Sequence, residues 1–217
     1  MKVNNQKRSH ISFSELKIWN ECPFKHKLVY LDKVKEFKGS EHTAFGTAMH
    51  YVCENLVINS KSKSMDLFNS KFIEELTLLK NNNVELDKKL VTSMRSQAKQ
   101  MVKHILPSLK NMFNQFEVVS VEEELMEEVS SDLKFKGFID LVIKKGDEYH
   151  IIDWKTCSWG WDSKRKADRM TTYQLTLYKY FFAKKHGIDI SKIETHFALL
   201  KRTAKKNNVE IFKVTSG

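Results

Sequence analysis

The sequence predicts an α/β protein, in which a small mixed β-sheet is flanked by helices and preceded by an N-terminal helical region. Two observations lead to this class. Apolar residues recur at three and four positions from Met65 to Leu79 and from Leu86 to Phe116, the spacing of amphipathic helices. Beyond residue 116, short apolar runs separated by turn residues are typical of β-strands. We therefore expect a single domain over residues 1–217, mainly helical in 1–116 and built on the sheet in 117–217.

Length and composition narrow the class of protein. At 217 residues, 41% of them hydrophobic, the chain is long enough to bury a core and is globular. Its net charge of +10 favours a polyanionic partner, either nucleic acid or an anionic membrane surface. No apolar run approaches the ~20 residues that span a membrane, and the first residues lack the apolar region of a signal peptide. We therefore expect a cytoplasmic protein without a membrane partner.

The N-terminal half carries helix signals. Ser12 and Glu15 form a capping box, which predicts the start of a helix. Gly46 precedes a second predicted helix with an apolar stripe, formed by Phe45, Ala48, Met49, Val52 and Leu56. Asn81 to Asn83 predict the loop between the next two helices, and Pro107 predicts a break or kink in the last of them. We interpret the helices predicted over Met65 to Leu79 and Leu86 to Phe116 as a scaffold.

The stretch from Gly137 to Lys155 predicts a hairpin that carries chemistry. Two apolar runs flank Gly146-Asp147, a signal for a two-residue turn. Side chains alternate along a strand, so Asp153 and Lys155 share a face, and the pairing can set Asp140 beside Asp153. Two carboxylates and an ammonium suit a Mg²⁺ or Mn²⁺ ion beside a phosphate. The alternative is a solvent-facing strand, because D-x-K is a common tripeptide.

The segment after Lys155 predicts a nucleic-acid contact. Aromatic side chains, which can stack on bases, are interleaved there with basic side chains, which can bind phosphates. These residues are Trp159, Trp161, Lys164, Arg165, Lys166 and Arg169. We expect at least one of the two indoles to anchor the core, and the loop to hold a single-stranded or frayed DNA end. A helix from Ala167 to Lys185, ended by Gly187, is expected next, and the closing hairpin is also basic around Lys201 to Lys206.

Several short motifs follow one another along the chain. G-x-(I/V)-D is Gly137 to Asp140, and (I/V)-(I/V)-D-x-K is Ile151 to Lys155. S-x-S-x-L with C-P and then G-T-x-x-H precede them, and Q-x-x-x-Y follows. In this order the chain resembles the PD-(D/E)xK nuclease superfamily, in particular its RecB-like branch, in patches from about residue 11 to residue 182. Ile139 stands where the superfamily's name has Pro, a departure common in that branch.

The resemblance implies a restriction-endonuclease-like core and roles for particular residues. It implies metal ligation by His50, Asp140 and Asp153, with the Trp154 backbone carbonyl as a further ligand, although a lone histidine is more often packed or exposed. Lys155 is then the residue that positions the nucleophile. The Q-x-x-x-Y match implies that Gln174 and Tyr178, four positions apart on one helix face, lie over the active site.

Many PD-(D/E)xK enzymes also contribute a glutamate from the strand before the first aspartate. The run from Phe116 to Val129 predicts that strand and holds several candidates, Glu122, Glu123, Glu124, Glu127 and Glu128. Consecutive glutamates cannot all share a face. We favour Glu124 as the catalytic residue, with its neighbours left open and a solvent-facing acidic strand as the alternative.

The cysteines bear on a further cofactor. Cys22, Cys53 and Cys157 are odd in number and form no C-x-x-C, which fits a reducing cytosol better than a disulfide framework. In the iron–sulfur members of this nuclease group, one cysteine lies near the position of Cys22 and three follow the catalytic core. No cysteine follows Cys157, so we expect no iron–sulfur cluster and interpret Cys22 as a small buried hydrophobic residue.

Together these observations predict a Mg²⁺- or Mn²⁺-dependent DNA nuclease. We expect an exonuclease that acts at DNA ends in recombination, repair or replication, with an endonuclease of the same fold as the first alternative. The second alternative is a DNA-binding module with an inactive site, which the presence of every expected site residue argues against. The sequence has no nucleotide-binding P-loop, so a helicase or recombination protein would be a separate partner.

Overall fold

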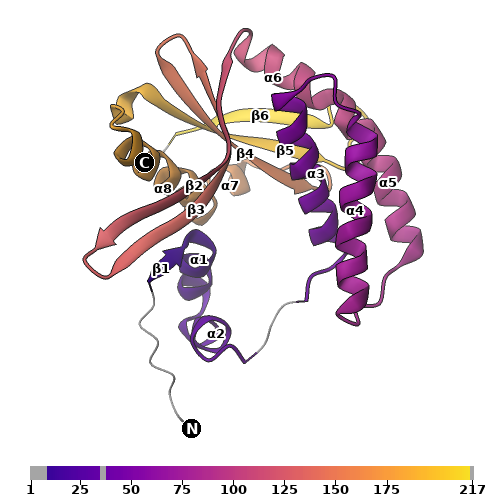
Figure 1. The fold of residues 1–217 in the computed structure, drawn as a ribbon, viewed down its shortest axis with the longest axis horizontal. Helices are drawn as coiled ribbons and strands as arrows, with labels where there is room; N and C mark the ends of the chain where they lie inside the picture. Colours follow the sequence, from indigo (N-terminus) through magenta and orange to yellow (C-terminus); the bar gives the residue numbers. More distant parts are fainter. Residues whose placement is uncertain (1–8, 35–37, 216–217) are drawn as a thin grey trace.

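A mixed β-sheet forms the middle layer of the protein, with helices on both faces (Figure 1). The computed structural model describes residues 9–34 and 38–215. Within these residues the sheet has six strands in the order β1-β3-β4-β5-β6, with β2 on the other edge of β3. The strands are β1 (His10–Ser12), β2 (Glu117–Ser130), β3 (Leu133–Lys145), β4 (Glu148–Cys157), β5 (Ile193–Lys201) and β6 (Val209–Val214). The predicted α/β class is confirmed.

The helices divide between the two faces of the sheet. Before the sheet come α1 (Phe13–Glu21), α2 (Pro23–His26), η1 (Lys27–Leu31), α3 (Glu41–Ile58), α4 (Ser64–Asn81), α5 (Lys88–Met101), η2 (Val102–His104) and α6 (Ile105–Phe113). After β4 come α7 (Ser163–Lys166), α8 (Arg169–His186) and η3 (Ile190–Lys192). Helices α3 to α6 bury one face of the sheet and α8 the other, which gives two separate hydrophobic cores. None of the helices described is long and apolar enough to span a membrane.

The β3–β4 hairpin has the predicted turn and register. Gly146 adopts φ +59°, the left-handed conformation that a two-residue hairpin turn requires. Pairing runs from Lys145 opposite Glu148 to Leu141 opposite Ile152. The next pair in this register is Asp140 and Asp153, so the two carboxylates stand side by side as the alternation predicted.

The sheet opens beside these carboxylates. Strand β2 pairs with one edge of β3 along almost its whole length. The other edge is shared: β1 pairs with Lys134 to Lys136, and β4 pairs only from Leu141 onward. Residues 137–140, the G-F-I-D motif, therefore have no strand partner on that edge. This break lets side chains from both helical layers reach the same point.

Three local predictions need correction. Gly46 lies inside α3, which begins at Glu41 because the Thr43 hydroxyl accepts a hydrogen bond from the Ser40 N–H (2.8 Å). The helix break falls at η2, before Pro107, which sits in the first turn of α6 where a missing N–H costs nothing. Cys22 is half-exposed and not buried, because its Sγ caps α2 by accepting the Lys25 N–H (3.4 Å).

Candidate active site

Asp140 joins the two central strands at the point where their pairing ends. Its Oδ2 accepts a hydrogen bond from the Trp154 backbone N–H at 2.6 Å. The side chain therefore satisfies a buried backbone donor that no strand carbonyl reaches. Asp140 Oδ1 remains turned toward His50 of α3, whose Nδ1 lies 3.5 Å away. Asp140 thus has one oxygen fixed by the fold and one oxygen available to the site.

Asp153 and Lys155 lie together on the α8 side of β4. The Asp153 carboxylate is 2% exposed, and the Lys155 ammonium lies 2.7 Å from its Oδ2. The two charged groups are close, but they are not aligned as a hydrogen bond, so Oδ2 has no hydrogen-bond partner among the residues described. Burial raises the pKa of Asp153 to about 6, with the Asp140 charge adding to the rise and Lys155 opposing it. A buried carboxylate oxygen that is close to an ammonium but accepts no hydrogen bond is suited to bind a cation.

Helix α3 brings an imidazole to the site. Gly46 lies one turn before His50, and a Cβ on Gly46 would lie 3.4 Å from Thr156 Oγ1, so α3 runs close against β4 at this point. Burial alone would lower the pKa of His50, but the Asp140 hydrogen bond and charge raise it above the usual value.

Two glutamates add to the negative charge. One ligand atom from each of His50, Glu122 and Asp140 lies within 4.8 Å of the others. Glu54, one turn after His50 on α3, hydrogen-bonds to Glu122. Burial, Asp140 and Glu54 together raise the pKa of Glu122 to about 7, and burial also raises that of Glu54. Sequence reasoning missed Glu54, although its i+4 spacing from His50 was a usable signal.

The structure places Glu122, and not Glu124, beside the aspartates. Glu122 has φ +49°, which reverses the alternation of side chains along β2. Glu124 is exposed and lies opposite Phe138, with its carboxylate 3.4 Å from the Lys136 ammonium. Of the glutamates that the sequence left open, Glu122 is therefore the one near Asp140 and His50, while the favoured Glu124 pairs with Lys136.

Helix α8 covers the opening from the other face. Gln174 Nε2 donates a hydrogen bond to the Tyr178 hydroxyl at 3.0 Å. A Cβ on Gly137 would lie 2.8 Å from Tyr178 Cε1, so only glycine lets this ring pack against the strand. Burial and the charges of Asp153 and Asp140 raise the pKa of Tyr178, which keeps its phenol protonated. The G-x-(I/V)-D and Q-x-x-x-Y motifs of the sequence therefore meet in one contact.

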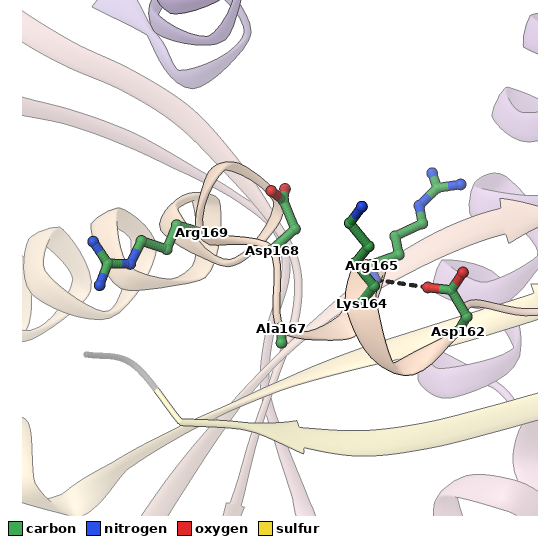
Figure 2. A pocket seen from close by; sticks show the side chains of 6 residues that line it. All are labelled: Asp162, Lys164, Arg165, Ala167, Asp168 and Arg169. Carbon is green, nitrogen blue, oxygen red and sulfur yellow. Dashed lines mark hydrogen bonds between the residues drawn. The ribbon is translucent and has the colours of Figure 1, made fainter.

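The loop after β4 divides into core and surface residues. Trp161 is buried, with its ring centroid 5.0 Å from that of Phe197, which confirms the expectation that at least one indole anchors the core. Trp159 is 79% exposed. Lys166 is held in an ion pair with Glu210. The remaining basic residues are exposed, and Figure 2 shows them around a shallow hollow of about 700 Å³ lined by Asp162, Lys164, Arg165, Ala167, Asp168 and Arg169.

Fold and site together define an α/β protein whose sheet opens over a cluster of carboxylates, an imidazole and a lysine. A sequence model of the PD-(D/E)XK nuclease superfamily matches residues 10–215. The chain therefore belongs to this superfamily, whose members are nucleases that use divalent metals. The crystal structure of SSO0001 is similar at 14% identity, covering 97% of this chain and 69% of that one with a TM-score of 0.38. No curated protein matches the chain significantly.

The raised pKa values predict a characteristic pH dependence of stability. Asp153 and Glu122 shift upward from ordinary values of 3.8 and 4.5, to about 6 and about 7. The folded state therefore binds these protons more tightly than the unfolded state does, and their binding stabilises the fold. This contribution to the free energy of unfolding is complete below pH ~4 and is lost as the pH rises toward ~7. We expect Asp153→Asn to raise the Tm of the EDTA-treated protein, by an amount that grows between pH 4 and pH 7.

Asp189→Asn is the matched control for this measurement. Asp189 is exposed and its pKa is lowered by hydrogen bonds from Ser191. Removing its charge should therefore lower the Tm instead of raising it. Thermal unfolding of both variants and the parent from pH 4 to pH 8 separates the two effects. A Tm difference for Asp153→Asn that stays constant across this range would contradict the assigned environment of Asp153.

Proposed function

We propose that this protein is a Mg²⁺- or Mn²⁺-dependent deoxyribonuclease of the RecB-like branch, acting as an exonuclease at DNA ends. One observation carries the metal site: the buried Asp153 Oδ2 lacks a hydrogen-bond partner among the described residues and lies beside Asp140. The surrounding donors, two carboxylates and an imidazole, are the type that these ions accept. His50, Asp140, Asp153 and the Trp154 carbonyl would hold the ion, which supplies charge to polarise the phosphate and acidify a bound water.

The remaining residues have roles that follow from their positions. Lys155 is held by the Asp153 charge, so its ammonium can position the nucleophile and offset charge on the scissile phosphate. Gln174 and Tyr178 close the α8 side of the opening, and Tyr178 offers a neutral phenol donor there. Glu122 takes the part that the sequence assigned to Glu124, because it lies next to Asp140 and His50. The Glu122–Glu54 pair can hold a proton near the site.

The ligands and the lysine are separable by experiment. We expect Asp140→Asn and Asp153→Asn each to lower cleavage by roughly 100-fold or more with the fold retained, because the charge that holds the metal is lost. Lys155→Ala should still bind Mn²⁺ in a calorimetric titration, with most of the rate gone. Lost Mn²⁺ affinity in Lys155→Ala would give that lysine a structural role instead.

Glu122→Gln and Glu124→Gln form a matched pair within β2. Only Glu122 lies beside the aspartates, so we expect Glu122→Gln to lower cleavage while Glu124→Gln cleaves like the parent protein. Equal activity of the two variants would remove Glu122 from the site.

The mode of attack requires a substrate test. End-labelled linear DNA and closed circular DNA are incubated with Mg²⁺, Mn²⁺ or EDTA. We expect degradation of the linear form alone, with no product in EDTA. Cutting of the circle would favour the endonuclease, and no cleavage with either metal would leave a DNA-binding module. A separate helicase or recombination protein would supply unwound ends, and a cytoplasmic location fits a nuclease of this kind.

We further propose that the exposed loop holds a single strand near the cut. Trp159 can stack on a base, and Lys164, Arg165 and Arg169 can contact phosphates, whereas Lys166 is engaged by Glu210. The loop leaves β4 two residues after Lys155, so its side chains are near the proposed substrate path.

Trp159→Ala and Trp161→Ala separate binding from packing. Base stacking on an exposed aromatic contributes roughly 1–3 kcal/mol, so Trp159→Ala should weaken single-strand binding about tenfold at constant salt. Trp161→Ala should lower the Tm with little change in affinity, because its ring fills the α8-side core. Unchanged affinity in Trp159→Ala would contradict this proposal, and the basic turn around Lys205 would then be the next candidate for the DNA-binding surface.

A further inference from the structure

A second cluster of metal-ligating side chains lies elsewhere on the sheet. His150 of β4 stands directly opposite Glu194 of β5, and His196 follows two residues along β5 on the same face. One ligand atom from each residue lies within 4.8 Å of the other two. His150 precedes Asp153 by three residues, roughly 10 Å along the strand, and its side chain faces the α6 side instead of the α8 side. The cluster is therefore separate from the nuclease site.

Both histidines are buried, and together they lack most of the hydrogen bonds that burial normally requires, although His196 keeps one to the Ile151 backbone. His150 is 4% exposed and His196 is 1% exposed. Neither nitrogen of His150, nor Nδ1 of His196, has a hydrogen-bond partner among the described residues. Buried polar atoms are almost always paired, so three unpaired ring nitrogens in one place point to a missing partner.

Glu194 presents a single oxygen to both rings. Its Oε2 lies 3.5 Å from His150 Nδ1 and 3.9 Å from His196 Nε2. These separations are too long for good hydrogen bonds. Donors around a tetrahedral zinc ion with bonds of about 2.0–2.1 Å lie about 3.3 Å apart, so a small inward movement of these side chains would complete such a shell. The other oxygen, Oε1, is held by Lys213 of β6, which fixes the orientation of the carboxylate.

The surroundings are those of a closed structural site. Phe113, the last residue of α6, packs on both rings, with centroids 5.0 Å from His150 and 5.1 Å from His196. Burial lowers the pKa of both histidines, to about 4 for His196, where the neighbouring His150 adds to the effect. Neutral imidazole is the form that ligates metals.

We propose that His150, Glu194 and His196 bind a Zn²⁺ ion that ties β4 to β5 beneath the end of α6. Two imidazoles and a carboxylate are zinc ligands, and a water can complete the tetrahedron. Mg²⁺ is a poor fit, because it prefers oxygen donors in an octahedral shell. The ion would stabilise the sheet end opposite the nuclease opening and take no part in cleavage.

The test uses the full chain with Asp140→Asn as the background, since Asp140 is a shared donor of the nuclease cluster. The protein is stripped with EDTA, equilibrated with Zn²⁺, dialysed and assayed for zinc by mass spectrometry. We expect the Asp140→Asn protein to retain one zinc ion more than the Asp140→Asn/Glu194→Gln double variant. Adding Lys192→Gln to the Asp140→Asn background is the matched control, because this lysine is exposed two residues before Glu194 and belongs to no part of the cluster, so the variant should retain zinc.

Thermal unfolding gives a second readout without altering the cluster. Zn²⁺ at about 100 times its Kd should raise the Tm of Asp140→Asn by roughly 5–10 °C, and an equal concentration of Mg²⁺ should leave it unchanged. Equal zinc content with and without Glu194→Gln would overturn the proposal. So would the absence of both retained zinc and a Tm shift in Asp140→Asn, since His150 and His196 would then be packed core rings alone.

Discussion

The hydrogen bond from the Trp154 N–H to the Asp140 carboxylate fixes the arrangement of the site. Strands β3 and β4 stop pairing at Leu141 and Ile152, and Asp140 and Asp153 are the buried residues that follow this end of the ladder. A break in a sheet leaves buried backbone groups without partners, which destabilises the fold. Asp140 supplies the missing hydrogen-bond partner to the Trp154 N–H, and its second oxygen still points toward His50. One side chain therefore both stabilises the opening and contributes to its chemistry.

The tripeptide Asp153-Trp154-Lys155 shows how alternation separates chemistry from packing. Asp153 and Lys155 face α8, and the Trp154 ring is 1% exposed in the opposite core with α3. The largest apolar side chain of β4 thus anchors the strand between the two charged residues. Such anchoring is needed because several carboxylates sit close together here, and their mutual repulsion opposes folding until a cation or proton offsets it.

Sequence reasoning succeeded where a local rule fixes geometry. The Gly146-Asp147 turn and the two-residue period set the register that places Asp140 beside Asp153, and both can be read directly. His50 and the Gln174–Tyr178 pair came only from the order of motifs, because their approach depends on how α3 and α8 pack on the sheet. Glu122 was among the candidates but could not be singled out by either route, since a single backbone angle of +49° decides which glutamate of β2 lies beside Asp140.

The N-terminal part of the chain contributes to the site as well as to the core. Helix α3 supplies His50 and Glu54 to the cluster, and β1 fills the edge of β3 below the opening. On the other face, a Cβ at Gly137 would lie 2.8 Å from Tyr178 Cε1, so this glycine sets how closely α8 approaches β3. A side chain at Gly137 would displace the Tyr178 ring, so the site depends on α3 and α8 approaching the sheet together.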